Sequence, residues 1–127
     1  TTPQDVALAD ARKGLKMFEA VGVPVLGVIE NMSTFICPCC DKETEIFGSG
    51  GGERRAQQSG GSLLGKLPLD GRIRAETDGG RPTVVADPDG PIAKRYREIA
   101  RAAAAALAKR PKDQRGKFGT IVVEGRK

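Results

Sequence analysis

The sequence predicts an α/β fold built on a parallel sheet, of which this chain holds about half. Residues 23–29 and 63–67 are nearly unbroken apolar runs, as in parallel strands covered on both faces. Segments with helical periodicity lie before, between and after them, and this alternation is typical of a parallel α/β sheet. Because sheets average about 5–6 strands, two convincing strands indicate half a sheet.

The first helix is expected to begin within residues 2–5 and to end at Gly22. Thr2 suits the cap, Pro3 suits the first helical position, and Asp5 completes a capping-box pattern. Apolar residues then recur at spacings of 3, 4 and 3, which places them on one helical face: Leu8, Ala11, Leu15 and Phe18.

Between the two strands the pattern predicts a loop, a hinge and a short helix. The loop follows Asn31, and residues 45–47 are a short extended candidate beyond it. The glycine-rich run 48–52 is expected to act as a flexible hinge that leads into a helix at about residues 53–58.

After the second strand, which Pro68 closes, the last helix is the clearest element. Residues 70–82 are rich in Gly, Arg and Asp and predict a loop that includes one helical turn, and residues 83–85 (Thr-Val-Val) predict a short strand. The helix begins at Pro91 and ends near Lys109, and its apolar stripe has spacings of 4, 3, 4 and 4: Ile92, Tyr96, Ile99, Ala103 and Leu107.

Residues 109–127 form a basic tail with a possible short strand at 119–124. The tail contains seven basic and two acidic side chains, which accounts for the whole net charge of +5. The body, residues 1–108, is therefore neutral, and a short basic tail is usually a solvated extension. Aromatic residues make up 4% of the chain, too few to form stacking platforms for bases. We expect no nucleic-acid partner.

The size and composition predict one domain in the cytoplasm. A chain of 127 residues has room for a single core. No apolar run approaches the ~18 residues that a membrane span needs, and we expect no membrane partner. The chain also shows no basic-then-apolar leader at its start.

Cys37, Cys39 and Cys40 are the candidate metal ligands. An odd number of cysteines packed within four positions is a poor disulfide framework, and Cys-x-x-Cys in a chain without an export signal indicates metal binding or redox chemistry. A redox pair is disfavoured because no helical pattern begins at Cys40. A loop with unmetallated thiols remains an alternative.

Cys37 and Cys40 supply only half of the four ligands that a zinc or iron–sulfur centre typically requires. The chain contains no histidine. The missing pair must come from another copy of the chain, another protein, or carboxylates. A twofold dimer that brings two Cys37/Cys40 pairs face to face provides four thiolates. Cys39 lies between them and is expected to point elsewhere; its substitution for one of the pair is the alternative.

Residues 60–67 match the spacing of a phosphate-binding loop but lack its chemistry. Leu67 stands where a Ser or Thr hydroxyl holds magnesium, and Pro68 follows where a helix must begin. We therefore reject this segment as a nucleotide site.

Several stretches in order resemble the Mrp/ApbC group of P-loop ATPases over roughly residues 1–108. They read TTPQDVALAD from Thr1, GVIENMS from Gly27, CPCC from Cys37 and LGKLPLD from Leu64, with FG, the glycine run and ER across residues 47–54 and Ile73-Arg74 beyond. The resemblance implies the C-terminal half of a doubly wound parallel-sheet P-loop NTPase fold. It also implies homodimerisation and transient binding of a [4Fe–4S] cluster for delivery to apo-proteins.

The resemblance assigns roles to individual residues. The family's Cys-Pro-x-Cys pair corresponds to Cys37 and Cys40, which would bridge a cluster between subunits. Asn31 matches the position that recognises adenine in related ATPases; an Asn that merely ends a strand in a turn is the alternative. Pro68 and Asp70 lie in a second loop that borders the base. The phosphate loop and magnesium-binding acid lie upstream in the family, so ATP and magnesium are expected only with that half.

The sequence thus favours an iron–sulfur cluster carrier that is not expected to hydrolyse ATP by itself. The alternative is a structural interaction module in which the cysteine loop binds zinc at a subunit contact.

Overall fold

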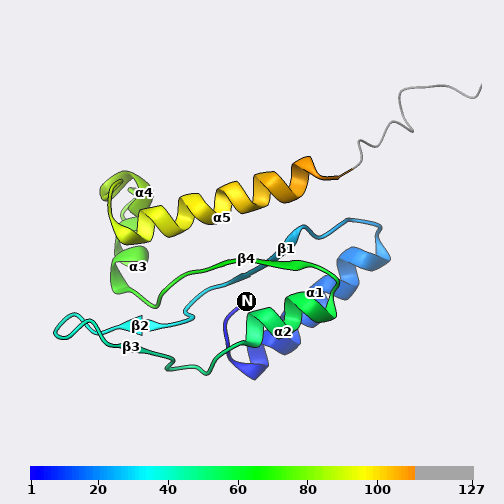
Figure 1. Cartoon of the computed structure of the whole chain (residues 1–127), viewed down its shortest axis with the longest axis horizontal. Helices are drawn as coiled ribbons and strands as arrows, with labels where there is room; N and C mark the ends of the chain where they lie inside the picture. Colours follow the sequence, from blue (N-terminus) through cyan, green and yellow to red (C-terminus); the bar gives the residue numbers. More distant parts are fainter. Residues whose placement is uncertain (111–127) are drawn as a thin grey trace, which may run out of the picture.

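The computed structural model describes residues 1–110 (Figure 1). The predicted strand at 119–124 and the rest of the tail beyond Arg110 lie outside these residues. Within them the elements follow in this order: α1 (Asp5–Ala20), β1 (Gly27–Glu30), β2 (Phe35–Ile36), β3 (Glu43–Thr44), α2 (Gly51–Gln58), β4 (Ser62–Lys66), α3 (Gly71–Asp78), α4 (Thr83–Ala86) and α5 (Pro91–Ala108).

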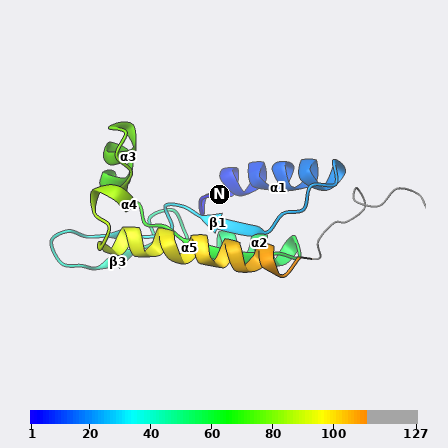
Figure 2. The same cartoon turned by 90° about the horizontal axis from the view of Figure 1, so that it is seen from above.

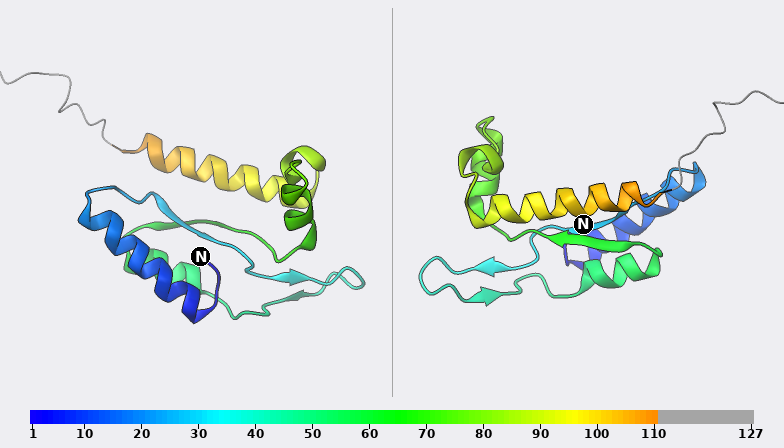
Figure 3. Two further views of the ribbon diagram at one scale, coloured as in Figure 1. Left: turned by 180° about the vertical axis from the view of Figure 1, so that it is seen from behind. Right: turned by 45° about the horizontal axis from the view of Figure 1, so that its top comes forward.

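A parallel pair of strands forms the centre of the fold. β1 pairs with β4, Gly27 opposite Ser62 and Glu30 opposite Lys66, with a register shift after Val28. α5 lies on one side of this pair, and α1 and α2 lie on the other (Figures 1 and 3). α3 and α4 stand at the beginning of α5 (Figure 2). Two parallel strands between helices confirm the predicted α/β class.

Thr1 continues the sheet along the other edge of β1. Its amino group donates to the carbonyl of Ile29 at 3.0 Å, and the N–H of Asn31 donates to the carbonyl of Thr1 at 2.8 Å. Thr1 thus bonds to the two neighbours of Glu30, and this is the hydrogen-bond pattern of a parallel ladder. The first residues are therefore extended, and α1 begins at Asp5 with Gln4 at its N-cap. The predicted cap at Thr2 is wrong.

β1 is shorter than the predicted strand over residues 23–29. Val23 is 48% exposed, Val25 40% and Ile29 38%, whereas Val28 is buried. β4 pairs only with residues 27–30, so the segment before Gly27 has no partner strand within the described residues. The expectation that the whole run is covered on both faces is therefore wrong.

The last two glycines of the run, Gly51 and Gly52, pack against neighbouring elements. The predicted flexible hinge is therefore wrong for these two residues. Gly50 has a left-handed backbone with φ of 68°, and Gly51 and Gly52 are buried in the first turn of α2. A Cβ on Gly51 would lie 2.7 Å from Leu8 Cδ1, and a Cβ on Gly52 would lie 2.8 Å from Glu30 Oε2. The absent side chains let α2 approach both α1 and β1.

Three further predictions were wrong in the stretches between the main elements. Residues 46–47 form a turn, and the strand lies earlier, at β3. The predicted loop at 70–82 contains the two-turn helix α3, capped by Asp70. The predicted strand at 83–85 is the helical turn α4, in which the carbonyl of Pro82 accepts from the N–H groups of Val85 and Ala86.

α5 confirms the predicted last helix and closes the core. Ile92 and Ile99 are buried, while Leu107 at the far end of the stripe is 60% exposed. Ile99 packs against β4 at Gly65. A Cβ added to Gly65 would lie 2.5 Å from Ile99 Cγ1. No helix within residues 1–110 has the length and apolar character to cross a membrane.

Candidate functional site

The cysteines lie at the tip of a hairpin that extends from the body of the fold. β2 and β3 pair antiparallel, Phe35 opposite Thr44 and Ile36 opposite Glu43. Figure 1 shows this hairpin projecting beyond the helices, at the end of the molecule where β1 and β4 end. The hairpin therefore presents its loop to the surroundings.

Backbone hydrogen bonds close the cysteine loop into a compact turn. The N–H of Cys37 donates to the carbonyl of Lys42 at 3.1 Å, and the N–H of Asp41 donates to the carbonyl of Cys37 at 2.9 Å. Asp41 takes a left-handed conformation with φ of 55°, which suits the short polar side chain of Asp. The chain thereby folds back between Cys37 and Cys40.

The turn stabilises the thiolate form of Cys37. The backbone N–H of Cys39, then the side chain and the backbone N–H of Cys40, hold the pKa of the Cys37 thiol below its ordinary value. The thiolate is the form of cysteine that binds metal. Cys37 is half-buried, and Cys39 and Cys40 are exposed; all three are free.

A single copy does not complete a metal site within residues 1–110. No group of three or more Cys, Asp and Glu side chains in this part of the chain is placed to hold a metal ion. The turn thus presents two of the predicted ligands, Cys37 and Cys40, on a projecting loop.

Asn31 and Pro68 lie at one edge of the sheet because the two segments continue side by side past the strands. The N–H of Leu67 donates to Glu30 at 2.9 Å, the N–H of Ser33 donates to Leu67 at 2.9 Å, and the N–H of Leu69 donates to Thr34 at 2.8 Å, in each case to the carbonyl. This is the carboxyl edge of the parallel pair, where ligands bind in open α/β sheets.

The predicted nucleotide residues also have local structural partners. Asn31 ends β1 in a turn, where its Oδ1 accepts from the N–H of Met32 at 2.9 Å. Asp70 caps α3 by accepting from the N–H of Arg72 at 2.8 Å, and its Oδ2 lies 2.8 Å from Arg72 Nη2. The hydrogen bond from the Arg72 side chain, more than burial, determines the pKa of Asp70 and holds it below the ordinary value. Pro68 is buried.

A hollow of about 530 Å³ joins the cysteine loop to the second predicted loop. It is lined by residues of both regions and of α5: Phe35, Ile36, Cys37, Pro38, Asp41, Pro68, Leu69, Asp70, Gly71, Arg72, Pro91, Ile92 and Arg95. Asn31 is not among them.

The sequence did not single out Arg72 and Arg95, which place two cations beside this hollow. Arg95 Nη2 lies 3.8 Å from Glu43 Oε1 and so links α5 to the hairpin strand β3. The signal available in the sequence was the position of Arg95 next to Tyr96 in the apolar stripe, which brings it to the core-facing border of the helix.

The formal phosphate-loop match is a strand, which confirms its rejection. Residues 62–66 form β4, and Lys66 Nζ lies 3.1 Å from Glu53 Oε1. The lysine is thus paired with a carboxylate of α2, and the next helix, α3, begins only at Gly71.

Comparisons with known proteins show what this chain is similar to. The family model described as NUBPL iron-transfer P-loop NTPase matches residues 1–104. The iron–sulfur cluster carrier protein of Pseudomonas fragi is 54% identical over 100 residues, which are 79% of this chain and 35% of that protein. The carrier of Escherichia coli K12 is 49% identical over 107 residues, 84% of this chain and 29% of that protein. The mitochondrial iron–sulfur protein required for NADH dehydrogenase of Arabidopsis thaliana is 48% identical over 100 residues, 79% and 32% respectively.

Two solved structures share the fold. The nucleotide-binding protein of Archaeoglobus fulgidus, solved in complex with ADP, has a TM-score of 0.57 and 31% identity over 71% of this chain and 36% of that chain. The cell division ATPase MinD of Pyrococcus furiosus has a TM-score of 0.60 and 24% identity over 83% and 40%, which supports the fold alone. The chain spans about a third of the length of the curated relatives, in their C-terminal part. The match to the family model over 104 residues, together with these identities, shows that the chain belongs to the NUBPL-type iron-transfer P-loop NTPase family.

Proposed function

We propose that this chain binds a [4Fe–4S] cluster through Cys37 and Cys40, that the same pair from a second copy completes the site, and that the cluster is passed to apo-proteins. The observation that carries the proposal is the exposed hairpin turn, in which backbone N–H groups stabilise the thiolate of Cys37. Two sulfurs on a projecting loop can meet a second pair without any change in the packed body. Relatives named as iron–sulfur cluster carriers support the cargo.

The geometry also suits release of the cluster. A cargo held between two loops, each supplying two ligands, is lost when the loops separate, whereas a four-ligand site inside one chain has to unfold first. At this end of the molecule Arg72 is paired with Asp70 beside the hollow next to Cys37, which holds the second loop in place. Arg95 also ties the hairpin to α5 through Glu43.

ATP binding and hydrolysis are proposed for the full-length proteins of this family rather than for this chain. In them Asn31, Pro68 and Asp70 would border the adenine, since all three lie at the carboxyl edge of the sheet. The short path from Pro68–Asp70 to the cysteine hairpin through the shared hollow would let nucleotide binding act on the loop. A cytoplasmic location stays a prediction, because one relative is mitochondrial by name.

Anaerobic reconstitution with iron and sulfide tests the proposal. We expect a brown dimer with one four-iron cluster per two chains, measured by iron and sulfide analysis and by light scattering. Cys37→Ser and Cys40→Ser should each abolish loading, and Cys39→Ser is the matched control that should retain it. Transfer is then followed as the gain of cluster by an apo-ferredoxin.

Two results would contradict the carrier function. Cluster loading that survives the double substitution of Cys37 and Cys40 would remove these residues from the site. Protein purified without reconstitution that holds one zinc per dimer and shows no visible absorption would favour the structural zinc module.

A further inference from the structure

A second feature of the fold, separate from the cysteine hairpin, is a basic groove between α1 and α2. Two adjoining hollows of about 390 and 340 Å³ share Arg12, Arg55 and Gln58. Seven charged residues line them, five of them basic and two acidic: Arg12, Lys13, Lys16, Arg54, Arg55, Asp5 and Glu19. Neither hollow shares a residue with the one beside Cys37.

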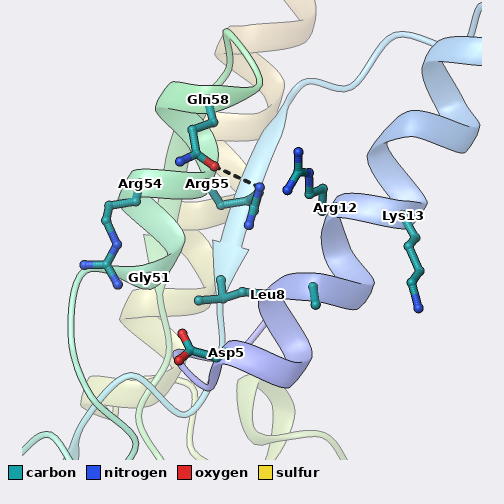
Figure 4. Close-up of a pocket in the computed structure, with 9 residues that line it drawn as sticks. Asp5, Leu8, Arg12, Lys13, Gly51, Arg54, Arg55 and Gln58 are labelled. Carbon is teal, nitrogen blue, oxygen red and sulfur yellow. Dashed lines mark hydrogen bonds between the residues drawn. The ribbon is translucent and has the colours of Figure 1, made fainter.

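Arg12 and Arg55 converge in this groove, and neither has an anionic partner among residues 1–110. Figure 4 shows their guanidinium groups pointing toward each other from the two helices, with Asp5 at the far end beyond Leu8. The salt bridges within residues 1–110 involve neither arginine. Two like charges that face each other repel, and an anion bound between them attracts both, which offsets the repulsion.

Arg55 is held in this orientation and still has an unused donor. Its Nη1 donates to Gln58 Oε1 at 2.9 Å, which fixes the guanidinium plane (Figure 4). Its Nε is covered and has no acceptor within the described residues. A covered donor of a charged group that lacks an acceptor is unfavourable, so an acceptor placed at this position would be stabilising. The side chain is thus positioned as one half of an oxyanion clamp.

We propose that the groove between α1 and α2 binds an oxyanion, phosphate or carboxylate, between the guanidinium groups of Arg12 and Arg55. The planar donors of arginine match two oxygens of such a group at once, which a lysine does not do. Gln58 positions Arg55, and Leu8 lines the larger of the two hollows. The site lies on the helices of one layer and acts independently of the cluster.

Isothermal titration of the complete 127-residue chain tests the proposal. The probes are inorganic phosphate and a hexaglutamate peptide, each in buffers matched in ionic strength with chloride. Arg12→Ala and Arg55→Leu should each weaken binding about tenfold or more, because hydrogen bonds to charged groups are lost. The matched control is Arg101→Ala, which removes an exposed arginine from α5 on the other side of the sheet. Circular dichroism verifies that every variant is folded.

The two probes distinguish the source of the oxyanion. Saturable binding of phosphate alone identifies a free oxyanion as the ligand, and tighter binding of hexaglutamate identifies an acidic protein segment. The proposal is overturned if neither probe gives binding heat in a buffer in which chloride at the same ionic strength gives none. It is also overturned if the Arg12 and Arg55 variants bind as tightly as the Arg101 variant.

Discussion

Replacing Gly52 by Ala should destabilise the chain, although alanine is the better helix former. In the first turn of α2 the added Cβ would lie 2.8 Å from Glu30 Oε2 and 2.9 Å from Glu30 Cβ. The Cβ of Glu30 is fixed to β1 and cannot swing away, and the side chain is 1% exposed. α2 must therefore shift, which strains the hydrogen bond from the N–H of Gly52 to the Glu30 carboxylate.

The magnitude follows from three opposing contributions. Alanine gains about 1 kcal/mol over glycine within a helix. Overpacking of a close contact costs about 1–3 kcal/mol, and losing a hydrogen bond to a buried charged group costs about 1.5–3 kcal/mol. The net expectation is a loss of about 2 kcal/mol or more in the free energy of unfolding.

Urea unfolding followed by circular dichroism measures this loss, and α1 offers a matched control. A Cβ on Gly14 meets nothing within 4 Å, so Gly14→Ala carries the propensity gain without the clash. We expect it to stabilise the chain by up to about 1 kcal/mol. Equal stability changes in the two variants, or a Gly52→Ala variant as stable as the wild type, would refute the close packing of α2 on β1.

Substitutions at Gly65 test the other side of the sheet, and substitutions at Asp70 test the cap of α3. Gly65→Ala should destabilise by about 1–3 kcal/mol, because its Cβ would lie 2.5 Å from Ile99 Cγ1. Ile99→Ala removes that atom, so the two changes combined should cost less than the sum of the single changes, as a double-mutant cycle in urea would show. Asp70→Ala should cost about 1 kcal/mol through the lost cap, whereas Asp70→Asn keeps the cap oxygen and removes the charge. Because Arg72 holds the pKa of Asp70 below its ordinary value of 3.8, the stabilisation from the charged form is present above that pH and is lost as the pH falls through the lower folded value. The stability difference between wild type and Asp70→Asn should therefore shrink below about pH 4 in unfolding experiments, and a constant difference would contradict the Arg72 pairing.

Elements with strong local signals were predicted well. The apolar stripe of α5 and the run that ends in Leu67 both appear in the structure with nearly the predicted bounds. The failures share a cause. At residues 83–85 the β-branched side chains predicted a strand, yet Pro82 begins a helical turn there and Thr83 is buried. β propensity is realised only beside a partner strand, and this segment has none within the described residues.

The candidate site shows the same division. The spacing of Cys37 and Cys40, the ligand shortage and the position of Asn31 after a strand were all readable from the chain. The hollow that joins the cysteine loop to Pro68–Asp70 could not be predicted from the sequence. Arg95, which lines it, belongs to α5 and comes more than fifty positions after the cysteine loop.

The sequence by itself determined the α/β class, the last helix and the Cys-x-x-Cys spacing of the two candidate ligands, because periodicity and spacing depend on residues a few positions apart. The tertiary structure alone decided where β1 begins, that Gly51 and Gly52 pack rather than flex, and that Arg12 and Arg55 face each other. These features depend on contacts between distant segments, such as Thr1 with Ile29 and Glu30 with Gly52. Such contacts form only when burial of the core brings the segments together, and no local pattern encodes their partners.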